Sequence, residues 1–519
     1  MRQHRLSYLL RRRRESLADV TVSSCLQNML DVSPTSLARS LNVFHEPFLR
    51  KANLSIINLL FPHHAFILQQ FYYNITHMTN SIPPTESPLQ NRRLPPTPVG
   101  RGIRAMVREP LQFFQSITSE YGDIVCYRPA PEPAYLINHP DYIRHVLVDN
   151  NRNYTKATSS NLLFNKVIGE GLLTSEGERW RKQRRMMQPT FHHTRIEQLD
   201  SMIVEATLSM LVQWQKKFEA NEPIDVTREM SALTLTITTR SLFGVDLKDE
   251  VREVGEVIDR AASYLEKPSN PRLIQSVQEF GAVVDRIIHQ RKQDFKDGGD
   301  LLSAMIMARD EKTGAAMDDE QLRYQVMTLM LAGYETTAST LSWTWYLLSQ
   351  DAAVVKRLRD EVRKVLQGRP PQFSDLEHMP YIEMVLDESL RLFPTAWTLG
   401  RRAIANDEID GYHIPADTVI AICIYTLHRH PNFWDRPDAF DPERFTAENI
   451  KKRNKFAYIP FGAGPRQCIG NNFGLMEAAL VMASVLQRFE LHLMPGMDIQ
   501  PQPLFVLRPN RDMMMSLHS

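Results

Sequence analysis

Cys468 has the side chain with the most specific chemistry in this sequence. It lies in the glycine-rich segment Phe461–Gly470, two residues after Arg466. The apolar run at residues 475–482 predicts a helix soon after this loop. The positive end of a helix and a neighbouring guanidinium both favour a thiolate. A thiolate in such a loop suits the axial position on haem iron, where it favours O–O cleavage. The alternative is a buried structural cysteine after a glycine turn.

A second candidate segment is Ala332–Thr337, Ala-Gly-Tyr-Glu-Thr-Thr, inside a long predicted helix. Asp318 is the expected N-cap, with a glutamine three residues later, and the helix should run to about Gln350. A glycine inside a helix costs about 1 kcal/mol relative to alanine, and threonine hydroxyls can bond carbonyls one turn earlier. We therefore expect a local opening that admits a small ligand or water beside Glu335 and Thr336. The alternative is an ordinary buried helix.

A third group is an acid with two arginines. Glu388 and Arg391 are three residues apart on a predicted helix and so share one face. Their apolar neighbours predict burial, where an ion pair needs further hydrogen bonds to offset desolvation. Arg444, in the segment Pro442–Phe445, can provide one. We expect these residues to be scaffold and not catalysts.

A fourth pair, Trp180 and Arg184, faces one way on a predicted helix. An indole N–H and a guanidinium together suit one carboxylate. The alternative is a solvent-exposed basic helix with one packed indole.

The bulk composition is that of an ordinary globular protein. The chain has 519 residues, 43% hydrophobic and 23% charged, with a net charge of +1. This balance indicates no global field for nucleic acid or membrane. Length alone would suggest about three or four domains, unless one large fold takes up most of the chain. Its four cysteines form no C-x-x-C pair, which argues against disulfides and structural zinc and indicates a reducing compartment. We expect a cytoplasmic protein that binds no nucleic acid.

The first 77 residues differ from the rest, with nine Lys/Arg, four Asp/Glu and the basic run Arg11–Arg14. Residues 52–76 are apolar but too interrupted for a span of ~20 residues. Three interpretations remain: weak membrane association through residues 52–76, an Arg-rich targeting peptide, or an extension that is poorly ordered or not part of the native protein. Residues 78–100 form a proline-rich entry segment, and 101–519 the expected catalytic domain.

Secondary-structure patterns place strands early and late around a helical middle. Short strands are predicted near residues 124–127, 135–137, 408–414 and 418–424, with a turn at Gly411 inside the third. Residues 200–370 show helical periodicity almost throughout. This order predicts an α+β fold that is mostly α.

Together these motifs resemble the cytochrome P-450 superfamily over about residues 95–510, of the soluble bacterial type without a fused reductase. The cysteine loop matches the pattern F-x-x-G-x-R-x-C-x-G at every fixed position. The other groups resemble the family's oxygen-activation helix, its E-x-x-R helix with the P-E-R-F loop, and its W-x-x-x-R motif. The resemblance implies the cytochrome P-450 fold, a helical prism with small β-sheets around a buried haem b (iron-protoporphyrin IX).

The resemblance also implies roles. Cys468 would ligate the iron, Thr336 would hold dioxygen and its proton-donating water, and Glu335 would relay protons. The expected haem-binding residues are Trp180, Arg184, Arg401, Arg466, Phe461, Gly470 and Ala332, with Arg402 as a neighbouring alternative to Arg401. The structural residues would be Glu388, Arg391 and Arg444. Ala396, Trp397 and Thr398, with the region 162–168, would border the substrate pocket.

The implied reaction is insertion of one oxygen atom of O2 into a C–H bond, by hydroxylation or epoxidation, of a hydrophobic small molecule. A fatty acid, terpenoid, alkane or polyketide-like compound would fit. Electrons would come to a monomeric protein from a separate ferredoxin or flavodoxin and an NAD(P)H-dependent reductase. The expected docking residues are Lys182, Arg185, Lys451, Lys452, Arg453 and Lys455. The alternatives are a peroxygenase or isomerase on the same fold, against which the Glu335–Thr336 pair argues, and a non-catalytic haem-binding sensor.

Overall fold

The computed structural model describes residues 93–98, 103–128, 132–247, 251–265, 272–293, 300–310 and 313–519. The predictions for residues 1–77 lie outside this part of the chain. Of the proline-rich segment 78–100, only residues 93–98 are described.

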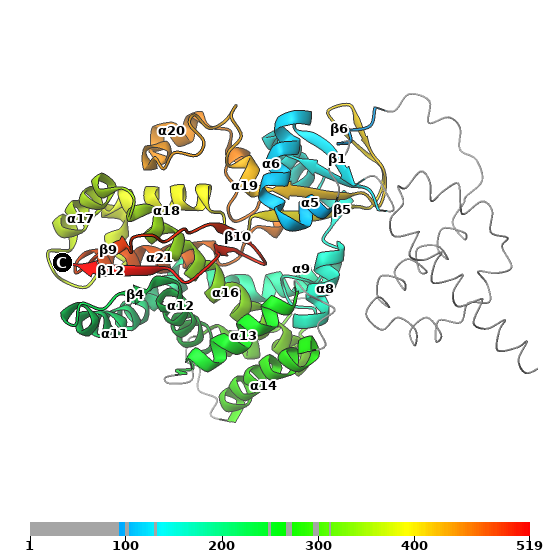
Figure 1. Cartoon of the computed structure of the whole chain (residues 1–519). Helices are drawn as coiled ribbons and strands as arrows, with labels where there is room; N and C mark the ends of the chain where they lie inside the picture. The colour runs from blue at the N-terminus through cyan, green and yellow to red at the C-terminus, as the bar shows by residue number, and fades with distance from the viewer. Residues whose placement is uncertain are drawn as a thin grey trace, which may run out of the picture. The chain divides into compact units, whose positions relative to one another are not determined.

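Helices make up most of the described chain, as Figure 1 shows. They are α5 (Ile103–Arg108), α6 (Pro110–Tyr121), α7 (Pro140–Arg144), α8 (Ser159–Ile168), α9 (Gly177–Met187), α10 (His193–Ile196), α11 (Asp200–Glu219), α12 (Val226–Phe243), α13 (Val251–Leu265), α14 (Arg272–Gln293), α15 (Leu301–Met307), α16 (Asp319–Leu348), α17 (Ala352–Leu366), α18 (Pro380–Leu392), α19 (Ile424–Leu427), α20 (Ala447–Lys452) and α21 (Asn471–Leu486).

The strands form small sheets. They are β1 (Ile124–Arg128), β2 (Ala134–Ile137), β3 (Tyr154–Thr155), β4 (Ile224–Asp225), β5 (Thr398–Ala403), β6 (Asp407–Ile409), β7 (Tyr412–Ile414), β8 (Val419–Cys423), β9 (Glu490–Leu493), β10 (Pro501–Pro503), β11 (Leu507–Pro509) and β12 (Met514–His518). The largest sheet has the order β1-β2-β8-β5-β3, and only β2 and β8 pair in parallel. A second sheet has the order β4-β12-β9, while β6-β7 and β10-β11 are two-stranded.

These elements confirm the predicted α+β, mostly α layout. Each strand predicted from the sequence is present, and the run at 408–414 splits into β6 and β7 at a turn. Asp410 and Gly411 both have positive φ in that turn, at 51° and 74°. Positive φ at both central residues matches the right-handed twist of a hairpin. The predicted N-cap is also present, because Asp318 accepts a hydrogen bond from the backbone N–H of Gln321 at 2.8 Å.

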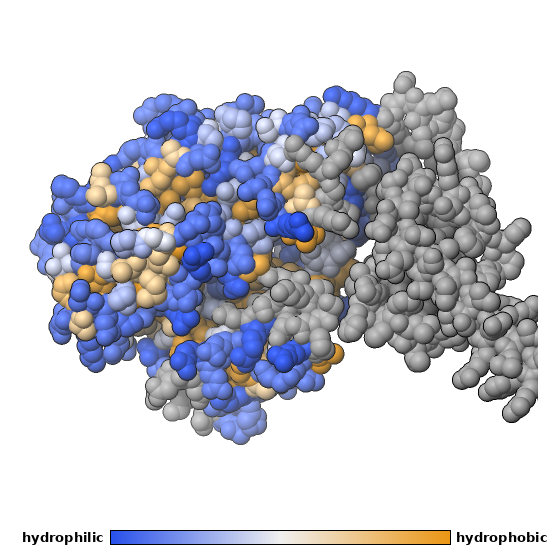
Figure 2. Space-filling view, viewed as in Figure 1, coloured by the Kyte–Doolittle hydropathy of each residue, from blue (hydrophilic) through white to orange (hydrophobic). Residues whose placement is uncertain are grey.

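Helix α16 lies within the hydrophobic core and ends at Leu348, close to the predicted end. Trp343 and Trp345 are fully buried on it. On the face shown in Figure 2, hydrophilic residues predominate over the described surface. None of the helices that the structure describes has the length and apolar character needed to cross a lipid bilayer.

Candidate active site

The cysteine loop is held by its own backbone. The N–H of Cys468 donates to the carbonyl of Phe461 at 3.0 Å, and the N–H of Gln467 donates to that of Gly464 at 3.0 Å. Gly464 has φ of +70°, and a Cβ there would lie 1.9 Å from the carbonyl oxygen of Leu147. Only glycine fits this close approach. The loop then leads into α21, so the cysteine precedes a helix N-terminus as predicted.

The electrostatics of Cys468 differ from the prediction. Its side chain is accessible, but surrounding protein raises the pKa of the thiol by desolvation, while the Gly470 N–H and Arg184 act to lower it. Arg466, expected beside the sulfur, instead pairs with Glu176 at 2.9 Å and donates to the carbonyl of Ser175 at 2.9 Å. Arg466 is therefore not among the groups that lower the pKa of the Cys468 thiol in this structure. The thiol must lose its proton when it binds a metal.

The segment Ala332–Thr337 lies in continuous α-helix, so the predicted opening of α16 is not present. Thr336 Oγ1 donates to the carbonyl of Ala332 at 2.8 Å, one turn earlier. A Cβ on Gly333 would lie 3.1 Å from Thr238 Cγ2 on α12. The glycine therefore serves close helix–helix packing. Ala332, Gly333 and Thr336 are partly exposed in this stretch, and Ala332 and Thr336, one turn apart, share one face.

This segment of α16 lies against the helix that follows the cysteine loop. A Cβ built on Gly474, in the first turn of α21, would lie 3.6 Å from Thr337 Oγ1. The two strongest motifs, 132 residues apart from Thr336 to Cys468, are thus brought together by the crossing of α16 and α21. Glu335 is 8% exposed, and its Oε1 lies 3.9 Å from Nη1 of Arg508, which the sequence analysis missed.

Three cations, Lys156, Arg401 and Arg466, interact electrostatically with one another and with Glu176 near the cysteine loop, and the Lys156 ammonium donates to the carbonyl of Leu173. Arg466 pairs with Glu176, and Glu176 Oε1 also accepts the backbone N–H of Lys156 at 2.8 Å. Burial, and then Arg401 and Arg466, lower the pKa of Lys156 to about 7. Burial, and then Arg466, lower the pKa of Arg401 to about 10. Such an excess of desolvated positive charge is costly unless an anion compensates it.

This cluster fits haem b. Protoporphyrin IX carries two propionates, and these anions would compensate the excess of buried positive charge. The accessible Cys468 thiol is a donor of the type that the iron of a haem-thiolate protein would require. The sequence analysis did not identify Lys156 or Glu176, because neither belongs to a motif with fixed spacing.

Trp180 and Arg184, both on α9, contact different residues of the cysteine loop. The guanidinium of Arg466 lies over the Trp180 ring, 4.0 Å from its centroid. Arg184 donates instead to the carbonyl of Gln467 at 2.9 Å, beside the cysteine. Of the two adjacent arginines, Arg402 has other partners, because it pairs with Glu132 and donates to the carbonyl of Ala157. Arg401, 7% exposed, is the arginine near Arg466 and Glu176.

The acid and two arginines of the third group are buried together. Glu388 and Arg391 are fully buried and form a bidentate pair at 2.6 and 2.7 Å. Arg391 also donates to the carbonyls of residues 428, 437 and 439. Glu388 Oε1 accepts the N–H of Asp441 at 2.9 Å and lies 3.4 Å from Nε of Arg444. These bonds supply the compensation that a buried ion pair requires.

The predicted pocket border meets a hairpin that the sequence did not indicate. Ala396, Trp397 and Thr398 are all partly exposed. Trp397 Nε1 donates to the carbonyl of Leu504, at the tip between β10 and β11, at 2.8 Å. The rings of Phe505 and Phe164, from the predicted pocket region 162–168, lie 4.9 Å apart.

Four of the predicted docking cations are exposed: Arg185, Lys451, Lys452 and Lys455. Arg453 is not free, since its guanidinium stacks on Trp434 and Phe445 at 4.4 and 4.5 Å and donates to the carbonyl of Arg444. It is better described as a scaffold residue.

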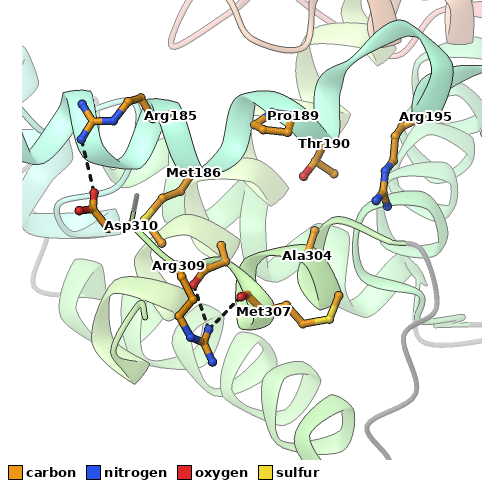
Figure 3. A pocket seen from close by; sticks show the side chains of 10 residues that line it. Arg185, Met186, Pro189, Thr190, Arg195, Ala304, Met307, Arg309 and Asp310 are labelled. Carbon is orange, nitrogen blue, oxygen red and sulfur yellow. Dashed lines mark hydrogen bonds and ion pairs between the residues drawn. The ribbon is translucent and has the colours of Figure 1, made fainter. Parts of the chain in front are cut away.

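A surface pocket of about 320 Å³ lies at the end of α9 (Figure 3). Its described lining includes Arg185, Arg195 and Arg309 and one carboxylate, that of Asp310, which lies 3.4 Å from Arg185. Arg309 donates to carbonyls at the end of α15. The described lining therefore has an excess of positive charge, and of the predicted site residues it includes Arg185.

Comparison with known proteins identifies relatives of this arrangement. The family model Cytochrome P-450 matches residues 98–516. Cyclooctatin synthase from Streptomyces melanosporofaciens is 37% identical over 77% of this chain and 89% of its own. Pentalenene oxygenase from Streptomyces avermitilis is 30% identical over 78% of this chain and 92% of its own. The crystal structure of the cytochrome P-450DA heme domain aligns with a TM-score of 0.77 at 26% identity, covering 83% of this chain and 98% of the other.

Proposed function

Since this chain belongs to the cytochrome P-450 family and is a haem-dependent monooxygenase, we propose that it inserts one oxygen atom of O2 into a C–H bond of a terpenoid. The cytochrome P-450 fold and the haem cofactor are those of the family. When bound, haem supplies the oxygen chemistry. The residues of this chain bind the haem, orient the substrate and control the protons around it.

One observation carries the proposal. The partly exposed face of α16 at Ala332 and Thr336 lies on the segment that contacts the start of α21, which follows the Cys468 loop. An accessible thiol and an accessible threonine hydroxyl on these two elements match the two sides of a haem site. Cys468 is proposed as the iron ligand, and Lys156, Arg401 and Arg466 as the cations that hold the propionates.

Proton control is assigned to Glu335 and Thr336. The Thr336 hydroxyl donates to the Ala332 carbonyl, so its oxygen stays free to accept a bond from a water on the open face of α16. Glu335 is nearly buried beside it and can exchange a proton with such a water. Thr336→Ala should therefore divert reducing equivalents to hydrogen peroxide while leaving haem binding intact.

The proposed substrate class rests on the pocket border and on the relatives. Trp397, Phe164 and Phe505 give that border an apolar, aromatic character. One relative is named cyclooctat-9-en-7-ol 5-monooxygenase, at 35% identity over 81% of this chain. Purified holoprotein is to be screened with terpenoids and with fatty acids for a substrate-induced spin shift, followed by product analysis. Shifts and oxygenated products only with fatty acids would overturn the terpenoid proposal.

Electrons are proposed to come from a separate ferredoxin or flavodoxin. The exposed cations Arg185, Lys451, Lys452 and Lys455, together with the arginine-lined pocket, favour an acidic partner through electrostatic steering. Charge reversal of Lys451 and Lys452 should slow reduction by a surrogate ferredoxin and leave spin shifts unchanged. Arg252→Glu, on α13 and 92% exposed, is the matched control. Equal slowing in the control would contradict the assignment.

A further inference from the structure

We propose that Arg508 is a positioning residue for Glu335, and that the β10–β11 hairpin thereby links the substrate pocket to the carboxylate that controls protons. The inference rests on the proposed role of Glu335. It adds a residue and an element that no motif in the sequence indicates.

The first observation is the ion pair itself. Nη1 of Arg508 lies 3.9 Å from Oε1 of Glu335, whose side chain is 11% exposed, while the Arg508 side chain is 37% exposed. A cation at this distance attracts the largely desolvated carboxylate toward the hairpin. An exposed ion pair between mobile side chains contributes little free energy. A positioning role therefore requires that other contacts hold the strand that carries Arg508.

The backbone supplies that fixation. The carbonyl oxygen of Leu507, the residue before Arg508, accepts hydrogen bonds from Ser339 Oγ at 2.7 Å and from Trp343 Nε1 at 2.9 Å. Ser339 and Trp343 follow Glu335 on α16 by one and two turns, so the three share one helix face. Leu507 is itself fully buried. The helix that carries the carboxylate therefore also holds the strand that carries its cation.

The other end of the hairpin reaches the predicted substrate pocket. Leu504 at its tip accepts the hydrogen bond from Trp397, and the ring of Phe505 lies against that of Phe164. In the hairpin, Gln502 pairs with Arg508, only a few residues from the tip. A ligand that moves Phe505 therefore acts on the short hairpin whose next strand carries Arg508.

This arrangement gives Arg508 a specific task. It holds the Glu335 carboxylate on the hairpin side of α16, and a ligand at the hairpin tip changes how firmly it does so. Removal of the guanidinium removes this attraction toward the hairpin, so that proton exchange between Glu335 and the open face of α16 is no longer coupled to the pocket. The chemistry at the haem is unchanged by this step, which alters only the timing of proton delivery.

The test uses the full-length holoprotein and needs neither substrate nor redox partner. Dithionite-reduced protein is mixed with O2, and the rate of reoxidation, its solvent deuterium isotope effect and the peroxide released per haem are measured. We expect Arg508→Gln to change the rate by about threefold, the scale of a partly exposed ion pair. Arg508→Lys should restore most of the wild-type behaviour. Arg511→Gln, which removes an exposed charge three residues on, should leave it unchanged.

The double variant separates positioning from a general effect. In a Glu335→Gln background, Arg508→Gln should cause no further change in the reoxidation rate, its isotope effect or the peroxide released. An Arg508→Gln protein identical to wild type, or an undiminished effect in the Glu335→Gln background, would overturn the inference. If Glu335→Gln alone has no effect, the proposed role of Glu335 fails. The infrared carboxylate band of Glu335, assigned by difference from Glu335→Gln, then still reports on positioning: a shift in Arg508→Gln supports it, and an unchanged band refutes it.

Discussion

The guanidinium of Arg466 lies over the indole ring of Trp180, with its central carbon 4.0 Å from the ring centroid. The same guanidinium pairs with Glu176, one turn before Trp180 along the chain. Residues of α9 and of the cysteine loop, far apart in the sequence, therefore fix one another at the edge of the proposed haem site. The indole thus supports the arginine that we propose as a propionate ligand.

Replacing that platform should weaken haem binding. A cation–π contact is worth about 0.5–2 kcal/mol, so Trp180→Leu should speed haem loss by up to about thirtyfold. The rate of haem transfer to apomyoglobin measures this directly. Trp180→Phe keeps an aromatic face and should lie close to wild type, and equal rates for Trp180→Leu and wild type would contradict the account.

Gly464 should be irreplaceable for a steric reason and not only a conformational one. Gly464 and Gly496 both have positive φ, at +70° and +80°, so an alanine at either costs about 1 kcal/mol in backbone strain. Only at Gly464 would the new Cβ meet a backbone oxygen, that of Leu147 at 1.9 Å; nothing lies within 4 Å at Gly496.

We therefore expect Gly464→Ala to bind less haem than Gly496→Ala. Its loss of unfolding free energy should also be several-fold larger. The haem-to-protein ratio and denaturant unfolding of the two variants provide the comparison. Similar losses in both would show that the cysteine loop does not depend on its contact with Leu147.

Haem binding should be linked to protonation of Lys156. Burial and the neighbouring arginines lower its pKa to about 7 in the haem-free protein, so this amine is mostly neutral at pH 8. Nearby propionates favour the charged form, and binding at pH 8 should take up about one proton at this site. Iron binding by Cys468 releases a proton at the same time.

The contribution of Lys156 is therefore obtained from a difference. Calorimetric haem titrations in buffers of different ionisation enthalpy give the net proton count for wild type and for Lys156→Met. Wild type should take up close to one more proton than the variant. Equal counts would place Lys156 outside the haem site.

Stability should depend on pH through Asp387. The hydroxyl of Tyr458 donates to its Oδ1 at 2.8 Å, yet desolvation raises the pKa of Asp387 from 3.8 to about 7. Between these values the folded protein holds a proton that the unfolded chain lacks. The stabilisation is present below pH 3.8 and is lost as the pH rises toward 7, with a slope of at most about 1.4 kcal/mol per pH unit.

Asp387→Asn removes this titration and can still accept the Tyr458 hydroxyl. The unfolding free energy of the variant, relative to wild type, should therefore rise between about pH 4 and pH 7. Denaturant unfolding at several pH values in this range measures the difference. A constant difference would mean that Asp387 ionises alike in the folded and unfolded chain.

The sequence predicted those features whose signal is local. The Asp318 cap, the turn at Gly411 and the sharing of one face by Glu388 and Arg391 each follow from residues within four positions of one another. The fixed spacing around Cys468 likewise indicated the loop, and the apolar run at residues 475–482 indicated the helix after it.

Contacts between residues that are far apart in the sequence could not be predicted from local patterns. Lys156, Glu176 and Arg508 come from separate elements, and only tertiary packing brings them to Arg466 and Glu335. The role of Gly333 was misjudged for the same reason, because its partner Thr238 lies on α12. Arg466 was assigned to the sulfur by proximity in sequence, although its side chain turns toward Glu176.

The central claim is that Cys468 holds haem iron as a thiolate, and the carbon-monoxide difference spectrum of the reduced full-length protein tests it most directly. The account predicts the long-wavelength Soret band of a haem-thiolate protein, and its loss in Cys468→Ser with haem still retained through Lys156, Arg401 and Arg466. Absence of that band in the wild type, or its persistence in Cys468→Ser, would contradict the account.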